Sequence, residues 1–460
     1  MKKKQIYIPS ATVILLATIV LVTALTYIIP GGTFVPTIDP ETGAEVITLE
    51  GFQSQPSTPV SFLEIPRRIV EAFGSGSTAN ICLTYLFMGG GIHILTASGA
   101  FQALAGTLMK KLNGKRLIMV AGFTTLFSVC NIVLSPHSFV AFVPFGVMFA
   151  RAMGYDAMVG VAMPLLGGAV AFSTGALLAT TMTAQTLVGL PIFSGAPYRF
   201  ICQILLLIPT ILYIYHYGES VRTGKRPSLV AELEAKKEDS AAAFDQKMTP
   251  QHIIVLLMFV ATMVLVVYGS SKLSWSNTHI AAAFMVLGLV IGLITGNSFE
   301  KTIQMYITGS KSMMGAAVLA GLAGAATGIL SSGGIMNTVV YAASNLILKV
   351  PSFLYAPMMF TMHILINCVI VSGGGQAAAT MPIMGPIATI CGIPMQSAVL
   401  CFNLGDGLGN YILPHSNQLV SYLEAGKVSF GKWLAFMGKL FAIWMVIAWI
   451  LSAVSTFVWG

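Results

Sequence analysis

Apolar stretches long enough to cross a lipid bilayer recur along the whole chain, and they constrain the fold more than any other feature. A membrane-spanning helix needs about 20 mostly apolar residues. Nine stretches meet this requirement, at roughly 8–29, 78–98, 156–190, 198–217, 252–270, 277–296, 312–331, 395–424 and 434–458. Only 9% of the residues are charged, against about a quarter in soluble proteins. The chain is therefore predicted to be an all-α polytopic membrane protein, and not a soluble enzyme or a nucleic-acid-binding protein.

Two further apolar regions, about 116–152 and 353–391, are interrupted at the middle by small polar residues. The interruptions are Ser135-Pro136-His137-Ser138 and Ser372-Gly373-Gly374-Gly375-Gln376. Each half has about 14–19 residues, which is short for a full crossing. Within a membrane, such breaks are tolerated only where protein or a water-filled cavity receives the freed backbone groups. Each region is therefore predicted to be a re-entrant helical hairpin.

The basic residues predict the orientation. If the hairpins do not cross, 19 of the 24 basic residues lie on the cytoplasmic side, and the external ones are Arg67, Arg68, Arg199, Lys272 and Lys349. Because cytoplasmic loops are enriched in Lys and Arg, the N-terminus is predicted to be cytoplasmic and the C-terminus external, in a bacterial-type inner membrane. Arg199 is expected at the membrane interface, and segment 31–60 could form a small external hairpin.

The two hairpin regions belong to two copies of one order of elements. A shift of 238 residues aligns Pro144 with Pro382 and Gly154 with Gly392. In each copy an over-long apolar segment follows the hairpin and is broken at its middle. These segments are 156–190, with a break at 171–175, and 395–424, with a break at 405–417.

The copies divide the chain into three parts. The first repeat is predicted at 1–217, a cytoplasmic linker with one extra span at 218–276, and the second repeat at 277–460. Because the extra span makes the second copy start outside, the repeats are predicted to be inverted. Inverted repeats with discontinuous helices are typical of secondary transporters that bind substrate near the midplane.

Residues at the tips and breaks are the candidate substrate ligands. Half-helix N-termini suit carboxylates, while free carbonyls and half-helix C-termini suit Na⁺. The predicted substrate-binding residues are Ser135, His137, Ser138, Ser173, Thr174, Ser372, Gly373, Gly374, Gly375, Gln376, Asn410 and His415. The amides could equally bond the broken backbone. Thr180, Thr181 and Thr183 are expected to bond within their own helix.

Asp406 is the one carboxylate of sixteen that falls in the middle of a predicted span. An acid at this depth costs about 2.5–3.5 kcal/mol on insertion scales, so it needs a partner or a function. Asp406 is predicted to hold Na⁺ or a proton, with Asn403, Asn131 and Asn367 as further candidates. The alternative is a capping role at the helix break. Apart from the coupling ion, no cofactor or metal is expected.

The run VSGGGQAAATMPIMGP from Val371 to Pro386, with Gly405-Asp406-Gly407, resembles the YfcC family of membrane carriers. Gly154-Tyr155-Asp156 and the run GLPIFSG at 189–195 are also similar to that family. The YfcC family belongs with DcuC-type C4-dicarboxylate carriers and, more distantly, with the ion transporter superfamily. The resemblance implies a homodimer with an elevator-like motion. It also implies that both hairpin tips and both broken helices line the substrate site.

The chain departs from the YfcC pattern at two places. The relatives carry two consecutive glutamates at the first hairpin tip, where this chain has His137-Ser138, and Asn-Pro in the first broken helix, where it has Leu177-Leu178. YfcC-like proteins are commonly labelled arginine/ornithine antiporters. A dibasic cargo would need more than one carboxylate in a dry site, and Asp406 is the single candidate here.

The sequence therefore predicts a cation-coupled secondary transporter of a small organic carboxylate, such as a C4-dicarboxylate, a short-chain acid or a neutral amino acid. The alternative is an amino-acid antiporter of the arginine/ornithine type. An intramembrane hydrolase using Ser173 or Ser372 with a histidine is disfavoured, because no nucleophile motif is present. A channel lacks a filter sequence, and a primary pump would need a phosphate-binding loop that the sequence lacks.

Overall fold

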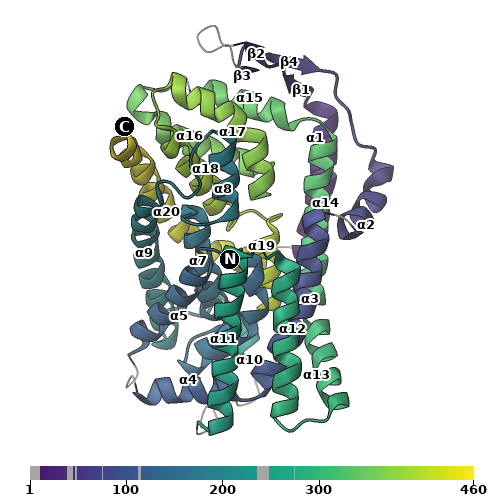
Figure 1. Ribbon diagram of the computed structural model, residues 1–460, viewed down its shortest axis with the longest axis vertical. Coiled ribbons are helices and arrows are strands. Elements are labelled where there is room, and N and C mark those ends of the chain that lie inside the picture. The colour runs from purple at the N-terminus through teal and green to yellow at the C-terminus, as the bar shows by residue number, and fades with distance from the viewer. Residues whose placement is uncertain are drawn as a thin grey trace, which may run out of the picture.

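The computed structural model describes residues 11–38, 45–46, 49–74, 76–111, 115–235, 248–273, 275–347 and 349–460. The molecule is elongated and mostly helical, with two short strand pairs at one end (Figure 1). Within the described ranges, six segments are long and apolar enough to cross a membrane: Thr78–Ala97, Ala157–Leu187, Ala196–Arg222, Asn277–Ile294, Met314–Ser332 and Phe430–Trp459. These segments confirm the prediction of a helical membrane protein with several apolar spans.

Three other predicted spans are shorter or divided in the structure. Apolar stretches at Leu15–Ile28 and Pro250–Val266 lie within α1 (Ala11–Ile28) and α11 (Pro250–Lys272). The predicted span 395–424 consists of two helices with a gap between them. Neither of the two is as long as the roughly 20 residues that a crossing requires.

The first half of the chain contains one helix that is divided into two parts, α7 and α8, followed by a long helix, α9. Its elements after α1 are α2 (Ile65–Gly74), α3 (Gly76–Ala97), α4 (Ala100–Lys111), α5 (Arg116–Cys130), the 3₁₀ helix η2 (Pro136–Phe142), α6 (Val143–Ala152), α7 (Ala157–Thr174), α8 (Ala179–Leu187), α9 (Ala196–Arg222) and α10 (Ala231–Ala235). Residues 236–247 of the predicted linker lie outside the described residues.

The second half adds a further series of helices. After α11 come α12 (Asn277–Ile294), α13 (Phe299–Ser312), α14 (Met314–Ser332), α15 (Met336–Ile347), α16 (Tyr355–Asn367), α17 (Gly373–Ile390), α18 (Met395–Gly409), α19 (Asn417–Ala425) and α20 (Phe430–Trp459). In both halves the first hairpin helix packs on the divided helix, α5 on α7 and α16 on α18. The divided helix then packs on the long helix that follows, α7 on α9 and α18 on α20.

Both helix breaks begin later than the sequence pattern predicted. Helix α7 continues through the predicted break and ends at Gly175, whose φ of 60° places it in the left-handed region. Helix α18 likewise continues to Gly409, and its break is 410–416. The small residues that were predicted to break these helices instead allow α7 and α18 to pack closely where they cross. A Cβ added at Gly407 would lie 2.3 Å from the Cα of Ser173, so glycine is needed for α7 and α18 to meet.

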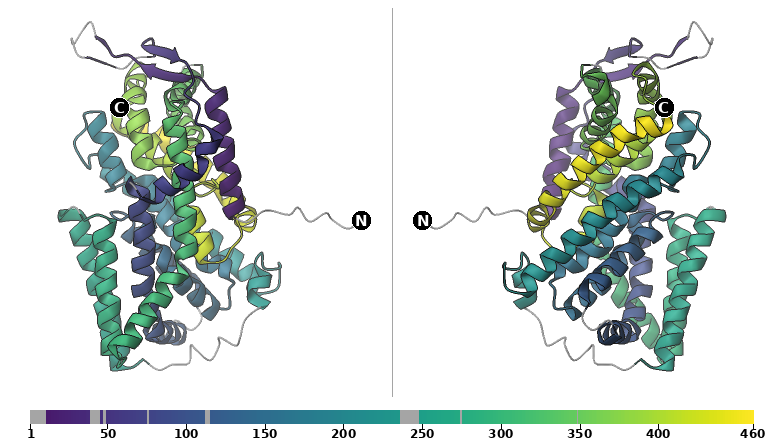
Figure 2. Two further views of the ribbon diagram at one scale, coloured as in Figure 1. Left: turned by 90° about the vertical axis from the view of Figure 1, so that its right-hand side faces the viewer. Right: turned by 90° about the vertical axis from the view of Figure 1, so that its left-hand side faces the viewer.

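The two halves interlock around α7, all of whose residues are buried. Helix α18 packs on α7, α17 on α8, and α19 on η2, so each divided helix contacts the other half of the chain. A second group of helices, α3, α12, α13 and α14, packs together beside them, as the two side views in Figure 2 also show. The core therefore lies where the divided helices cross.

The strands lie at one end of the molecule. Strand β1 (Gly31–Phe34) pairs antiparallel with β4 (Phe52–Gln55), with Gly31 opposite Gln55, and β2 (Thr37–Ile38) pairs with β3 (Glu45–Val46). The predicted small hairpin at 31–60 is thus present in the described residues. The C-terminal end of α20 lies at the same end as these strands, and α4 and α13 lie towards the opposite end (Figures 1 and 2).

The crossing of α7 and α18 predicts the effect of Gly407→Ala. The added methyl has no room against Ser173, so the substitution should destabilise the protein by roughly 1–3 kcal/mol, as overpacking of a core does. Thermal unfolding of the purified protein in detergent measures this. Gly438→Ala is the matched control, because a Cβ there meets nothing within 4 Å. Equal unfolding temperatures for the two variants would contradict the crossing.

Candidate functional site

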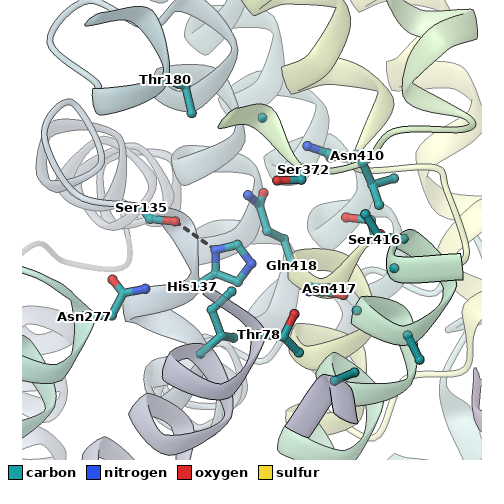
Figure 3. Close-up of a pocket in the computed structure, with 18 of the residues that line it drawn as sticks. Thr78, Ser135, His137, Thr180, Asn277, Ser372, Asn410, Ser416, Asn417 and Gln418 are labelled. Carbon is teal, nitrogen blue, oxygen red and sulfur yellow. Dashed lines mark hydrogen bonds between the residues drawn. The ribbon is translucent and has the colours of Figure 1, made fainter. Parts of the chain in front are cut away.

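A cavity of about 510 Å³ lies where both hairpin tips and the ends of both divided helices converge (Figure 3). These elements contribute Ser135, His137, Phe172, Thr180, Val371, Ser372, Gly373, Asn410, Ser416, Asn417 and Gln418. The rest of the lining comes from the neighbouring helices: Arg68, Glu71, Ala72, Thr78, Ile81, Asn277, Gly324, Ala325, Thr327, Gly328 and Ser332. The cavity therefore lies between the interlocked halves and the group formed by α2, α3, α12 and α14.

In the first tip, His137 has contacts at its Nδ1 atom and on one face of its ring. Ser135 Oγ and His137 Nδ1 are 2.8 Å apart, and the His137 ring stacks on Tyr85 of α3 with 6.5 Å between the ring centroids. The Tyr422 hydroxyl of α19 donates to the Pro136 carbonyl oxygen at 2.9 Å. Among the described residues His137 Nε2 has no hydrogen-bond partner. The tip thus offers one free ring nitrogen next to the cavity.

The second tip begins helix α17 against Asp406. Ser372 caps the helix, because its Oγ accepts from the Gly375 N–H at 3.3 Å. A Cβ added at Gly373 would lie 2.7 Å from Asp406 Oδ2. The Asp406 carboxylate therefore lies beside the first turn of α17, where unpaired N–H groups carry partial positive charge. Asp406 is 1% exposed.

Asn367 joins the second tip to the second break. Its Nδ2 donates to the Asp406 main-chain oxygen at 2.7 Å and to Asn410 Oδ1 at 3.3 Å. In the part of the chain that the structure describes, the side-chain oxygens Asn367 Oδ1 and Asp406 Oδ1 are buried and have no hydrogen-bond donor. Asp406, Asn367 and Asn410 thus form one cluster with unused oxygen atoms behind the cavity wall.

Arg199 is enclosed within the protein, so the expectation that its head reaches the membrane interface is wrong. The side chain is fully buried, and its Nη1 donates to the Thr174 carbonyl oxygen at 2.9 Å and to Asn403 Oδ1 at 2.7 Å. The guanidinium offsets the partial negative charge at the C-terminal end of α7. The sequence did carry a sign of this role, because Arg199 is the only charged residue between Asp156 and Glu219.

Several predicted ligands lie outside the cavity lining. Ser173 Oγ donates to the Ala169 oxygen at 2.7 Å and Thr174 Oγ1 to the Val170 oxygen at 3.1 Å, both within α7. Gln376 Nε2 donates to the His363 oxygen at 2.9 Å, and Asn131 Nδ2 to the Phe127 oxygen at 2.8 Å. The remaining predicted substrate ligands that do not line the cavity are Ser138, Gly374, Gly375 and His415, and the predicted ion ligands Asp406, Asn403 and Asn367 do not line it either.

Seventeen of the lining residues were not among the predicted ligands, and three of them correct or extend the prediction. Thr180 was expected to bond within its helix, but it lines the cavity, and its Oγ1 has no partner among the described residues. Its neighbour Thr183 does donate to the Ala179 oxygen at 3.0 Å. The other two are Arg68 and Glu71 of α2, a charged pair with 3.8 Å between Nη1 and Oε2. Only the tertiary fold brings α2 to the cavity.

The polar groups around the cavity are arranged for binding a ligand and not for nucleophilic catalysis. Ser173 and Ser372 are both engaged with backbone groups of their own segments. Within the described ranges no group of three or more His, Cys, Asp or Glu side chains is placed to hold a metal ion. A small cation could still be held by one carboxylate with amide and carbonyl oxygens, which are ligands that hard cations prefer. The Asp406 cluster has this composition.

Comparisons with known proteins identify related carriers. The family model described as DcuC, C4-dicarboxylate anaerobic carrier, matches residues 8–456. The "Putative basic amino acid antiporter YfcC" of Escherichia coli is 26% identical over 392 residues, covering 81% of this chain and 77% of the relative. A Haemophilus influenzae protein described as uncharacterized is 25% identical and covers 99% of this chain and 98% of its own.

Two solved structures are also similar. The YdaH transporter of Alcanivorax borkumensis has a TM-score of 0.47 and 14% identity, covering 97% of this chain and 98% of its own. MtrF of Neisseria gonorrhoeae, whose structure is described as illuminating a class of antimetabolite efflux pumps, has a TM-score of 0.46 and 15% identity. That match covers 99% of this chain and 96% of the other.

The cavity predicts different thiol accessibility at two serines of the original ligand set. In a background with the native cysteines replaced, Ser372→Cys should react with a water-soluble maleimide at least about tenfold faster than Ser173→Cys, because thiol modification follows exposure. Ser372 lines the cavity, while Ser173 is fully buried. Mass spectrometry of the labelled protein gives the rates. Similar rates at both positions would contradict the assignment of the cavity wall.

Proposed function

Because the chain belongs to the DcuC family of C4-dicarboxylate anaerobic carriers, we propose that it is a cation-coupled secondary transporter of a small organic carboxylate. The cargo would be a C4-dicarboxylate, a short-chain acid or a neutral amino acid. Membership in a family of membrane carriers makes the chain a membrane transporter. The observation that carries the finer proposal is a cavity lined by residues of both predicted hairpin tips, with a helix N-terminus next to it and polar atoms that have no partner among the described residues.

The donors around the cavity support a carboxylate cargo. The N-terminal turn of α17 begins at the lining residue Gly373 and supplies partial positive charge. If the Ser135 hydroxyl donates to His137 Nδ1, then Nε2 carries the ring proton and is a second donor. The Thr180 hydroxyl is a third. Backbone and neutral side-chain donors of this kind bind carboxylates without burying a fixed positive charge.

The balance of charge disfavours a strongly cationic cargo. Among the described lining residues, the ionic side chains are Arg68 and Glu71, which lie 3.8 Å apart and also pair more closely with Glu64 and Arg67, respectively. A dibasic molecule in a dry site would need several carboxylates. Asp406 is close behind Gly373, but it is one carboxylate. A neutral or anionic cargo therefore fits the described residues better.

We assign the coupling ion, Na⁺ or H⁺, to Asp406. A comparison with Asp156 supports a role beyond helix capping. Asp156 caps α7 and accepts hydrogen bonds from the Val159 N–H at 3.2 Å, the Tyr217 hydroxyl at 2.8 Å and the Ser228 hydroxyl at 2.6 Å. In contrast, Asp406 Oδ1 has no donor among the described residues. A buried carboxylate oxygen without a donor is a costly arrangement unless an ion or a proton binds it.

In this proposal, one of the three predicted asparagines is a second ligand of the ion, and the other two have structural roles. Asn367 is the second candidate ligand, because its Oδ1 is unused and its Nδ2 already contacts Asp406. Asn403 is held by Arg199 and would position α18. Asn131 bonds to its own helix in the other half.

We further propose an elevator-type motion of the interlocked halves past α3, α12 and α14. The lining supports it, since one side of the cavity belongs to the divided helices and the other to that second group. Sliding one group along the other would carry the cavity contents with it. The resemblance to YfcC carriers adds the expectations of inverted repeats and a homodimer.

The proposed orientation places the strands and the C-terminus outside and the N-terminus in the cytoplasm. It rests on the distribution of basic residues, with α4 and its terminal Lys110 and Lys111 towards the end opposite the strands (Figure 1). Cytoplasmic enrichment in basic residues is the general rule.

The coupling assignment predicts that Asp406→Asn abolishes ion-driven uptake. Proteoliposomes loaded with the variant should accumulate radiolabelled succinate no faster than empty liposomes, since the amide can neither carry the proton nor supply a charged ligand. Asp156→Asn is the matched control, a second buried acid with its own hydrogen-bond donors, and should retain uptake per folded protein. Unfolding curves establish that both variants are folded. Full gradient-driven uptake by Asp406→Asn would overturn the assignment.

The alternative function is an antiporter of basic amino acids, which is favoured by the printed name of the Escherichia coli relative. Counterflow in proteoliposomes separates the two functions. Preloaded succinate or fumarate should drive entry of labelled succinate, while preloaded arginine or ornithine should not. Exchange of arginine for ornithine without carboxylate exchange would establish the alternative instead.

A further inference from the structure

A second cavity, of about 660 Å³, lies away from the candidate substrate site, between α5, η2 and α6 on one side and α4 and α11 on the other. Its volume is within the range of small-molecule sites, about 300–1,000 Å³. Eight of its lining residues are phenylalanines, and the others are aliphatic or small. The lining contains no charged residue and no side-chain hydroxyl or amide. Such a cavity can hold only an apolar group.

The cavity opens on the apolar outer surface of the molecule. Its rim includes Leu126 of α5 and Val264 of α11, which are 52% and 64% exposed. Both helices carry apolar stretches of the kind that face lipid. Because lipid tails surround such helices in a bilayer, an acyl chain can enter the cavity from the side without crossing water.

Basic residues lie at one end of this cavity. The lining residues Ile118 and Met119 are in the first turn of α5, about one helical turn after Lys115. Lys115 is exposed, and so is Lys111, the last residue of α4, which lies about 10 Å along the helix from the lining residue Leu104. No acidic residue occurs between residues 72 and 155 of the sequence. An amphiphile with its tail in the cavity would therefore meet positive charge at its head.

We propose that this cavity binds one acyl chain of an anionic phospholipid, whose headgroup is held by Lys111 and Lys115. The apolar lining selects the chain, because burying its methylene groups away from water is favourable. The lysines select the headgroup, as juxtamembrane basic residues do on the cytoplasmic leaflet. The charge complementarity distinguishes this site from an ordinary lipid-facing groove.

The site has a direct physical connection to the first hairpin tip. Phe139 and Phe142 of η2 line the apolar cavity, and His137 of the same short helix lines the polar one. A bound chain would therefore contact η2 from the side opposite to the substrate. The bound chain would pack between η2 on one side and α4 and α11 on the other, and would hold η2 in place relative to these helices.

The test is native mass spectrometry of the purified full chain with palmitoyl-oleoyl phosphatidylglycerol or with the phosphatidylcholine of the same chains. One phosphatidylglycerol per protomer should remain bound, with preference over phosphatidylcholine. Gly122→Leu fills the cavity, and since a Cβ at Gly122 meets nothing within 4 Å, the protein should still fold. This variant should reduce the bound fraction at least fivefold. Gly438→Leu, an equally open glycine in α20, should bind as the wild type does.

Two more variants make the outcome decisive. Val264→Trp fills the same cavity from α11 and should reduce binding in the same way, which covers the case in which Gly122→Leu is unstable. Lys111→Gln with Lys115→Gln should abolish the preference for phosphatidylglycerol while leaving chain binding. The proposal is overturned if phosphatidylcholine binds equally well to the wild type, if the filled variants bind lipid normally, or if cross-linking places a second copy of the chain over the cavity.

Discussion

The fold depends on one constraint: helices that end inside an apolar body leave carbonyl groups that water cannot reach. An unsatisfied buried polar group costs about 1–3 kcal/mol, so each break needs a donor from elsewhere. Arg199 donates to Thr174 at the end of α7, the Trp433 indole to Tyr411 in the second break, and the Tyr422 hydroxyl to Pro136 in the first tip. These bonds allow the breaks to exist at depth.

The donors tie the two halves of the chain together, because several of them cross between the halves. Tyr422 belongs to α19 and its acceptor to the first hairpin, while Arg199 also binds Asn403 on α18. The close contact of Gly407 with Ser173 adds a third crossing point. The polar cavity forms only when these contacts are made, since its walls come from both halves. Binding at the cavity and the integrity of the interlocked core are therefore physically linked.

The local composition of the breaks was readable from the sequence, but the partners of the breaks were not. Small polar residues at 135–138 and 372–376 identified the two interruptions that line the cavity, and Asp406 was identified as an acid within an apolar segment. Arg199 was misplaced because a charge near the end of an apolar stretch usually lies at the interface. Its actual acceptors are 25 and 204 residues away. Thr180 and α2 were missed for the same reason, since no local pattern records which distant element covers a break.

By itself, the sequence determined the membrane environment, the helical class and the places where polar residues interrupt the apolar segments. These properties follow from apolar length and from the positions of small polar residues, which act over a few turns of helix. The tertiary structure decided where the helices end, which predicted ligands line the cavity and which instead form hydrogen bonds with the backbone. Ser173 and Ser372 illustrate the difference, because both are serines close to glycines in the sequence. Ser173 is fully buried where α7 and α18 cross, whereas Ser372 lines the cavity. Close packing between helices that are distant in the sequence determines which serine is buried, and no periodic pattern in the sequence records that packing.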